Sequence, residues 1–179
     1  MNIAVYCGSS CGNDPKYVEA ARTLGRWIGE NGHTLVYGGA NKGIMGEVAD
    51  AVLKAEGKVI GVLPRIMLIQ ERKHLGLTEY IETSSMAERK TRMIELADAF
   101  VALPGGIGTL DEITEVMTLA SLGIIKDPIV LYDAGGYYQP LKGVLENIVN
   151  KEFGRKEYFS KVLISDNILK IAKHLALRS

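Results

Sequence analysis

Apolar runs of strand length alternate along the chain with amphipathic stretches of helix length. The pattern predicts strands at 2–6, 34–37, 58–63, 80–83, 99–103, 128–132 and 161–164. A first helix is expected between the Asp14-Pro15 start signal and the Asn31-Gly32 stop signal. Further helices are expected at 45–56, 86–97, 109–122, 140–151 and 166–177, with a short one near 66–71.

This alternation of strands with helices is typical of βαβ units around a parallel sheet. The runs Ala99–Leu103 and Ile129–Leu131 are apolar throughout, as expected for strands that helices cover on both faces. No repeat, low-complexity tract or long linker divides the chain. We therefore expect one α/β domain over residues 1–179, a three-layer sandwich with a mostly parallel, doubly wound sheet.

Charge and composition exclude several classes of partner. The 179 residues include 21 Lys and Arg and 21 Asp and Glu, so no basic excess favours a nucleic-acid polymer or a membrane surface. No apolar stretch approaches the ~20 residues of a membrane span, and the N-terminus has no basic segment typical of a signal peptide. The two cysteines are expected to be reduced thiols in the cytoplasm. The three scattered histidines predict no metal site.

The 20 glycines are clustered rather than spread along the chain. Parallel sheets bind ligands at the carboxyl ends of their strands, where the winding direction reverses. Three expected strand ends carry glycine or small polar residues: 7–10, 38–39 and 104–106. Their coincidence predicts a single site.

The strongest local signal is the segment 103–112, between an expected strand and an expected helix. Glycine lets the backbone approach a ligand closely, and the free N–H groups of a helix start favour a phosphate. The segment is neither GxGxxG nor GxxxxGK[ST], and a tight turn that merely needs glycine is the alternative. The residues predicted to bind phosphate are Gly105, Gly106, Ile107, Gly108 and Thr109.

The loop 38–46 also joins a strand to a helix, and Gly39 is expected in the opposite wall of the pocket. Glycine that serves close packing is the alternative. Ser9 is expected to contact phosphate or ribose, and its alternative is a simple turn.

The expected helix 86–97 places two cations on an apolar stripe. Met86, Arg89, Lys90 and Met93 share one face, and unpaired buried cations would be costly. Either the stripe lies at the surface with its cationic ends in water, or it borders a polar cleft with an anion or a carboxylate. Glu112, in the first turn after the glycine loop, offers that carboxylate, although a helix-start glutamate needs no further role.

Met86-Ala87-Glu88-Arg89-Lys90, followed by Pro104-Gly105-Gly106-Ile107-Gly108-Thr109-Leu110-Asp111-Glu112, resembles the M-x-x-R-K and P-G-G-x-G-T-x-x-E signature of the Lonely-guy proteins. These are cytokinin-activating phosphoribohydrolases, often mislabelled lysine decarboxylases. The resemblance covers most of the chain and includes segments 7–10, 37–39, 43–46, 61–64 and 136–138.

This resemblance implies a Rossmann-like homodimer that needs no cofactor. It would hydrolyse the N-glycosidic bond of an adenine-type nucleoside 5′-monophosphate, such as AMP or a cytokinin riboside monophosphate, to free base and ribose 5-phosphate. It implies that Arg89 and Glu112 are the catalytic pair. The other residues it places at the substrate, with those predicted above, are Lys90, Met86, Glu71 and Thr118.

Two other functions stay open on the residues alone. A non-catalytic nucleotide sensor or carrier would use the same phosphate loop, but it would not need both Arg89 and Glu112. A nicotinamide-dependent oxidoreductase is disfavoured because the first strand is followed by Cys7-Gly8-Ser9-Ser10, without GxGxxG. No lysine lies in a context that identifies a pyridoxal Schiff base, so a decarboxylase has no support of its own.

Overall fold

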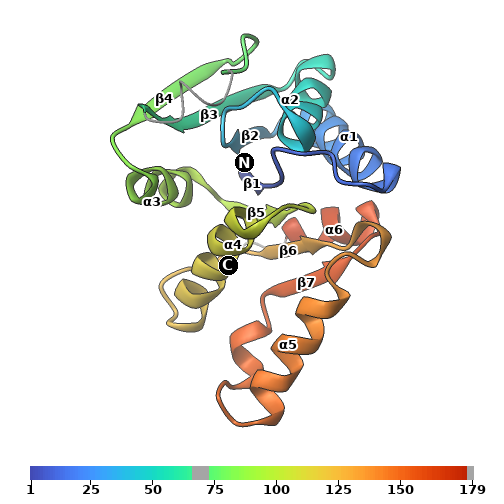
Figure 1. The fold of residues 1–179 in the computed structure, drawn as a ribbon, viewed down its shortest axis with the longest axis vertical. Helices are drawn as coiled ribbons and strands as arrows, with labels where there is room; N and C mark the ends of the chain where they lie inside the picture. The colour runs from blue at the N-terminus through green and yellow to red at the C-terminus, as the bar shows by residue number, and fades with distance from the viewer. Residues whose placement is uncertain (66–72, 177–179) are drawn as a thin grey trace.

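The computed structural model of the chain describes residues 1–65 and 73–176 (Figure 1). Its strands are β1 (Asn2–Tyr6), β2 (Thr34–Tyr37), β3 (Lys58–Pro64), β4 (Glu79–Thr83), β5 (Ala99–Ala102), β6 (Ile129–Tyr132) and β7 (Val162–Ser165). Its α-helices are α1 (Pro15–Glu30), α2 (Gly43–Lys54), α3 (Met86–Leu96), α4 (Ile107–Ser121), α5 (Gln139–Asn150) and α6 (Ile168–Leu175). Two short 3₁₀ helices are η2 (Ala134–Gly136) and η3 (Lys156–Phe159).

The described strands form one sheet in the order β4-β3-β2-β1-β5-β6-β7, and each pairing between them is parallel. The chain first winds outward from β1 to β4. It then returns through α3 to β5, on the other side of β1 (Figure 1). The winding direction therefore reverses between β1 and β5, and the doubly wound α/β fold expected from the sequence is confirmed.

The sheet separates two apolar clusters, and alternate residues of β1 enter each of them. Ile3 and Val5 pack with residues of α1, α2 and α6. Ala4 and Tyr6 pack with residues of α3, α4 and α5 on the opposite face. Because successive side chains of a strand point to opposite faces of the sheet, both faces are apolar. Helices cover each face, and the fold therefore has three layers.

The expected element boundaries differ by a few residues from the observed ones. Helices α2 and α4 begin two residues earlier than expected, at Gly43 and Ile107, because glycine-rich segments that suggest loops continue into the first turn. The sequence did not predict η3. The short helix expected near 66–71 lies outside the described residues. None of the described helices combines the length and the apolar character needed to cross a membrane.

Candidate active site

A hollow of about 190 Å³ lies at the carboxyl ends of the central strands, where the winding reverses. The loop after β1, the start of α4 and one face of α3 enclose it. It is lined by Cys7, Gly8, Ser9, Met45, Met86, Arg89, Gly106, Gly108, Thr109, Asp111 and Glu112. Residues far apart in the sequence therefore meet where the positions of the strand ends predicted a site.

Backbone hydrogen bonds fix the loop after β1 between its two neighbours. The N–H of Gly8 donates to the Pro104 carbonyl at 3.1 Å, and the N–H of Met45 donates to the Gly8 carbonyl at 3.2 Å. Gly43 has φ +57°, and a Cβ there would lie 2.3 Å from the carbonyl carbon of Ser9. Only glycine allows α2 to begin this close to the loop, so the glycine in this segment serves close packing.

The N-terminus of α4 faces the hollow without a side-chain cap. Gly106 is the N-cap residue and has no side chain to accept from the first-turn N–H groups. Those N–H groups have no partner within the helix itself. Gly106, Gly108 and Thr109 line the hollow, and Thr109 is buried. The helix start therefore presents N–H donors and the positive end of its dipole to any anion bound there.

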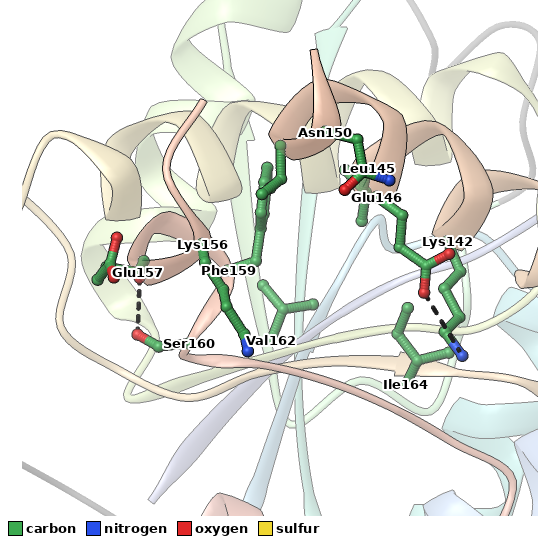
Figure 2. A pocket seen from close by; sticks show the side chains of 11 residues that line it. Lys142, Leu145, Glu146, Asn150, Lys156, Glu157, Phe159, Ser160, Val162 and Ile164 are labelled. Atoms are coloured by element: carbon green, nitrogen blue, oxygen red, sulfur yellow. Dashed lines mark hydrogen bonds and ion pairs between the residues drawn. The ribbon is translucent and has the colours of Figure 1, made fainter. Parts of the chain in front are cut away.

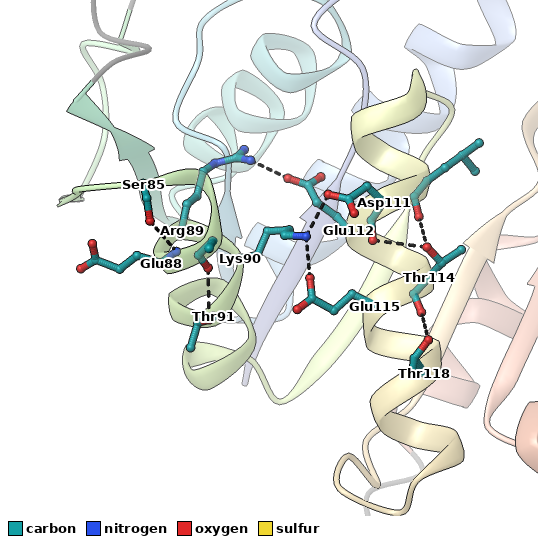
Figure 3. Close-up of polar contacts among 12 residues, drawn as sticks. Ser85, Glu88, Arg89, Lys90, Thr91, Asp111, Glu112, Thr114, Glu115 and Thr118 are labelled. Carbon is teal, nitrogen blue, oxygen red and sulfur yellow. Dashed lines mark hydrogen bonds and ion pairs between the residues drawn. The ribbon is translucent and has the colours of Figure 1, made fainter.

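Arg89 of α3 and Glu112 of α4 form a buried ion pair in the wall of this hollow (Figure 3). Arg89 Nη1 lies 2.5 Å from Glu112 Oε1, and the two side chains are only 8% and 9% exposed. Arg89 Nε donates to the Val62 carbonyl of β3 at 3.0 Å. Two acceptors from different elements thus fix the planar guanidinium. The buried cation on the apolar stripe has the carboxylate partner that the sequence suggested.

Burial raises the pKa of the Glu112 carboxyl above its ordinary value of 4.5, and the Arg89 guanidinium opposes that rise. Burial of Cys7 raises the pKa of its thiol, and the nearby Glu112 charge raises it further, so the thiol stays protonated. An acid with a raised pKa beside an open hollow is typical of a general acid or base.

Gly38, at the end of β2, makes room for the Arg89 guanidinium. A Cβ at this position would lie 2.2 Å from Arg89 Nη2 and 2.9 Å from the Met45 sulfur. Sequence reasoning predicted Gly39 as a pocket residue and missed this role of its neighbour. The glycine pair was the available signal, but the contact depends on a residue from a distant helix.

Lys90, the neighbour of Arg89, forms ion pairs with α4 (Figure 3). Its Nζ lies 2.9 Å from Asp111 Oδ2 and 2.9 Å from Glu115 Oε2, and these carboxylates raise the pKa of the lysine. Lys90 is not among the residues that line the hollow. Its charge joins α3 to α4 beside the buried pair, and to contact a ligand it would have to leave a carboxylate.

The remaining predicted residues differ in where the structure places them. Ser9 and Met86 line the hollow, and Gly105 lies directly before its Gly106 wall. Gly39, Ile107 and Thr118 are not in its lining: Gly39 packs against Gly61, Ile107 is exposed, and Thr118 is exposed further along α4 (Figure 3). Glu71 lies outside the described residues.

A larger hollow of about 710 Å³ lies elsewhere, at the β7 edge of the sheet (Figure 2). Helix α5, η3 and β7 enclose it, with Leu145, Phe159 and Val162 among its apolar walls. Its charged residues include the Lys142–Glu146 pair, whose side chains are 50% and 62% exposed. Its lining contains no buried acid and no α-helix start, so its size alone does not make it the better candidate.

Comparisons with known proteins agree on one family. A family model described as possible lysine decarboxylase matches residues 45–175. A cytokinin riboside 5′-monophosphate phosphoribohydrolase from Rhodococcoides fascians is 40% identical over 93% of this chain and 85% of its own length. Phosphoribohydrolases with the same specificity in their names, from Oryza sativa subsp. japonica and Arabidopsis thaliana, are 40% and 42% identical. They match over 97% and 84% of this chain and 73% and 70% of their own lengths.

Solved structures share the fold at lower identity. A molybdenum cofactor binding protein from Rippkaea orientalis has a TM-score of 0.70 and 24% identity, covering 98% of this chain and 96% of its own. A Moco carrier protein from Chlamydomonas reinhardtii has a TM-score of 0.74 and 21% identity, covering 98% and 97%. At this identity the likeness concerns the fold alone.

The contact between Gly38 and Arg89 predicts an unusual response to a small substitution. In Gly38→Ala the new methyl group must displace the guanidinium, and overpacking of this kind costs about 1–3 kcal/mol of unfolding free energy. Gly143→Ala, in α5 with open space where its Cβ would lie, is the matched control and should be about 0.4–1 kcal/mol stabilising. Urea unfolding of both variants measures these changes.

A double-mutant cycle separates the contact with Arg89 from the contact with Met45. If the clash with Arg89 causes the loss of stability, most of the unfolding free energy lost in Gly38→Ala should be regained in an Arg89→Ala background. Equal costs in both backgrounds would contradict the assignment.

Proposed function

The chain belongs to the family of cytokinin riboside 5′-monophosphate phosphoribohydrolases, and we propose that it is itself a hydrolase of this kind. It cleaves the N-glycosidic bond of an adenine-type nucleoside 5′-monophosphate and releases the free base and ribose 5-phosphate. One observation carries the proposal: the buried Arg89–Glu112 pair and the open N-terminus of α4 line the same hollow. The groups suited to bind an anion therefore lie next to the acid.

The 5′-phosphate binds at the start of α4. The N–H groups around Gly106 and Gly108 and the hydroxyl of Thr109 are its donors, supported by the positive end of the helix dipole. Ser9 adds a donor from the facing loop. These donors are fixed before the ligand arrives because hydrogen bonds between the loops hold the backbone.

Glu112 acts on the sugar. Cleavage of the bond between C1′ and the base nitrogen develops positive charge on the ribose ring, and a carboxylate beside C1′ stabilises it. Water supplies the hydroxyl group that C1′ gains, and the departing base gains the proton. Glu112 lies one turn of helix beyond Thr109, so a ribose whose phosphate occupies the helix start extends toward the carboxylate.

Arg89 controls the state of Glu112. Burial favours the neutral carboxyl, whereas the guanidinium 2.5 Å away favours the ionised one. Arg89 therefore lowers the pKa of Glu112 against the effect of burial and favours the carboxylate form that the proposed chemistry uses. Arg89 also lines the hollow, and the N–H groups that Glu112 and Val62 leave unused can bind substrate oxygens.

Other residues have supporting parts in the proposal. Met86 forms an apolar wall of the hollow, Gly105 and Ile107 belong to the phosphate loop, and Gly39 shapes the neighbouring strand end. Lys90 contributes positive charge beside the nucleotide while it joins α3 to α4.

A non-catalytic carrier is the rival function. It would need the phosphate loop but no buried ion pair, and an unneeded pair of this kind costs stability. The fold does not favour the carrier, because carriers and enzymes share such folds.

We also propose that the active form is a homodimer. Thr118 matches a family position at the substrate, yet in this chain it lies exposed on α4, beyond the hollow of its own chain. A second copy packed against α4 would bring Thr118 to the partner's site. Light scattering at micromolar concentration should give twice the 19.5 kDa chain mass, and a mass of one chain would contradict the proposal.

The proposed substrate class is tested by incubation with AMP, with isopentenyladenosine monophosphate and with the corresponding nucleosides. Base release, followed by chromatography, is expected from the monophosphates. Two hydrogen bonds to a charged phosphate contribute on the order of 3 kcal/mol, so kcat/KM for a nucleoside should be at least about 100-fold lower. Equal turnover of nucleoside and monophosphate would exclude the phosphate subsite, and no release from either would exclude the hydrolase.

Glu112→Gln tests the acid directly, because it keeps the shape of the side chain and removes its charge. We expect kcat to fall at least about 100-fold, the scale of losing one directed electrostatic group, while nucleotide binding survives. The matched control is Glu95→Gln, an exposed glutamate on α3 paired with Arg92, for which kcat should stay at the wild-type value.

If Glu112 merely complements the helix dipole, its replacement costs about 0.3–1 kcal/mol of stability. A folded Glu112→Gln variant with wild-type kcat would remove this residue from the mechanism.

A further inference from the structure

The turn after β6 contacts the phosphate loop through two neighbouring tyrosines. The Tyr137 hydroxyl donates to the Gly105 carbonyl, and the Tyr138 hydroxyl donates to the Leu103 carbonyl at 2.7 Å. The carbonyl between them, that of Pro104, accepts from the N–H of Gly8 at 3.1 Å. Three consecutive carbonyls of the loop are therefore each held by a donor from another part of the chain.

The turn that carries these hydroxyls is itself fixed. The Asp133 side chain accepts from the N–H of Tyr138 at 2.7 Å and from the side-chain amide of Gln139. The Tyr137 ring packs edge to face against Tyr17, with ring centroids 5.6 Å apart, and against Tyr138, with centroids 5.1 Å apart. Packed rings leave the two hydroxyls little freedom to leave the loop.

The two hydrogen bonds have different consequences for the amides that follow. In a trans peptide the carbonyl and the next N–H point in opposite directions. The bond from Tyr137 turns the Gly105 carbonyl toward a neighbouring hollow of about 290 Å³, which Tyr137 lines. The N–H of Gly106 therefore points away from Tyr137. Within residues 1–65 and 73–176, none of the hydrogen bonds uses this N–H.

The bond from Tyr138 has no such effect, because the residue after Leu103 is a proline without an N–H. Tyr138 can stabilise the loop but cannot direct an amide. The chain thus contains two similar bonds to one loop, of which only one determines the direction of a potential phosphate donor.

We propose that Tyr137 is a positioning residue for the phosphate subsite: its hydroxyl orients the Gly105–Gly106 peptide so that the Gly106 N–H faces the 5′-phosphate. The inference rests on the proposed function, because it assumes a phosphate at the start of α4. Tyr137 touches no reacting atom and acts only through the peptide that it holds.

Tyr137→Phe and Tyr138→Phe form a matched pair, since each removes one hydroxyl and keeps the ring. Titration calorimetry with ribose 5-phosphate should show Kd about fivefold higher for Tyr137→Phe, as expected for one lost hydrogen bond. KM for AMP should rise by the same factor with kcat nearly unchanged, because the phosphate is held equally in ground and transition states. Adenosine, which lacks the phosphate, should bind both variants like the wild type.

Tyr138→Phe should lower the melting temperature and leave the Kd of ribose 5-phosphate unchanged. Equal losses of affinity in the two variants, or wild-type affinity in Tyr137→Phe, would overturn the assignment. A second measurement uses the unmodified protein: the ¹⁵N–¹H signal of Gly106 should shift when inorganic phosphate is added. An unmoved Gly106 signal at saturating phosphate would also overturn it.

These measurements distinguish the inference from the proposed function. If the wild type binds ribose 5-phosphate but hydrolyses no nucleotide, the proposed hydrolase fails, and the Kd values still decide the role of Tyr137. If the wild type binds no phosphate ligand, the phosphate subsite and the role of Tyr137 both fail.

Discussion

The ion pair between Arg89 and Glu112 is buried in the wall of the hollow, and much of the local structure compensates for the cost of that burial. Removing a charged group from water costs on the order of several kcal/mol, which a partner offsets only when the geometry is good. The Val62 carbonyl accepts a second N–H of the guanidinium, and Gly38 leaves the space that the guanidinium occupies. Lys90 forms a second link between the same helices through Asp111 and Glu115. A fully apolar contact between α3 and α4 would be simpler, so this costly arrangement supports a chemical role for the pair.

Much of the fold was predictable because its signals are local. The length and spacing of apolar runs indicated a parallel sheet covered on both faces, and capping residues such as Asp14 mark helix ends with their own side chains. Boundaries were less predictable where glycine continues into a helix, as at Gly43. The hydrogen bonds that stabilise such a start come from another strand end, here the Ser10 carbonyl. No pattern within a short window contains that information.

The candidate site was likewise predictable where its signals are local and not where they depend on packing. The glycine loop before α4, the carboxylate of Glu112 and the cations of α3 follow from sequence spacing, because each depends on one helix. The role of Gly38 beside Arg89, and the pairing of Lys90 with Asp111 and Glu115, depend on how α3 packs against β2 and α4. Such contacts become visible only when the packing of the helices is known.

Helix α4 carries both the N–H groups proposed to bind the phosphate and the acid Glu112, and its geometry fixes the distance between them. At its N-terminus, the N–H groups of Gly106, Gly108 and Thr109 have no hydrogen-bond partner among the described residues, and Glu112 follows three residues after Thr109. A rise of about 1.5 Å per residue separates the anion-binding end from the acid by about 4.5 Å along the axis. Hydrogen bonds within the helix keep that separation constant. The loops therefore need only to hold the start of α4 open, which explains why hydrogen bonds from β1 and from the turn after β6 converge on residues 103–105.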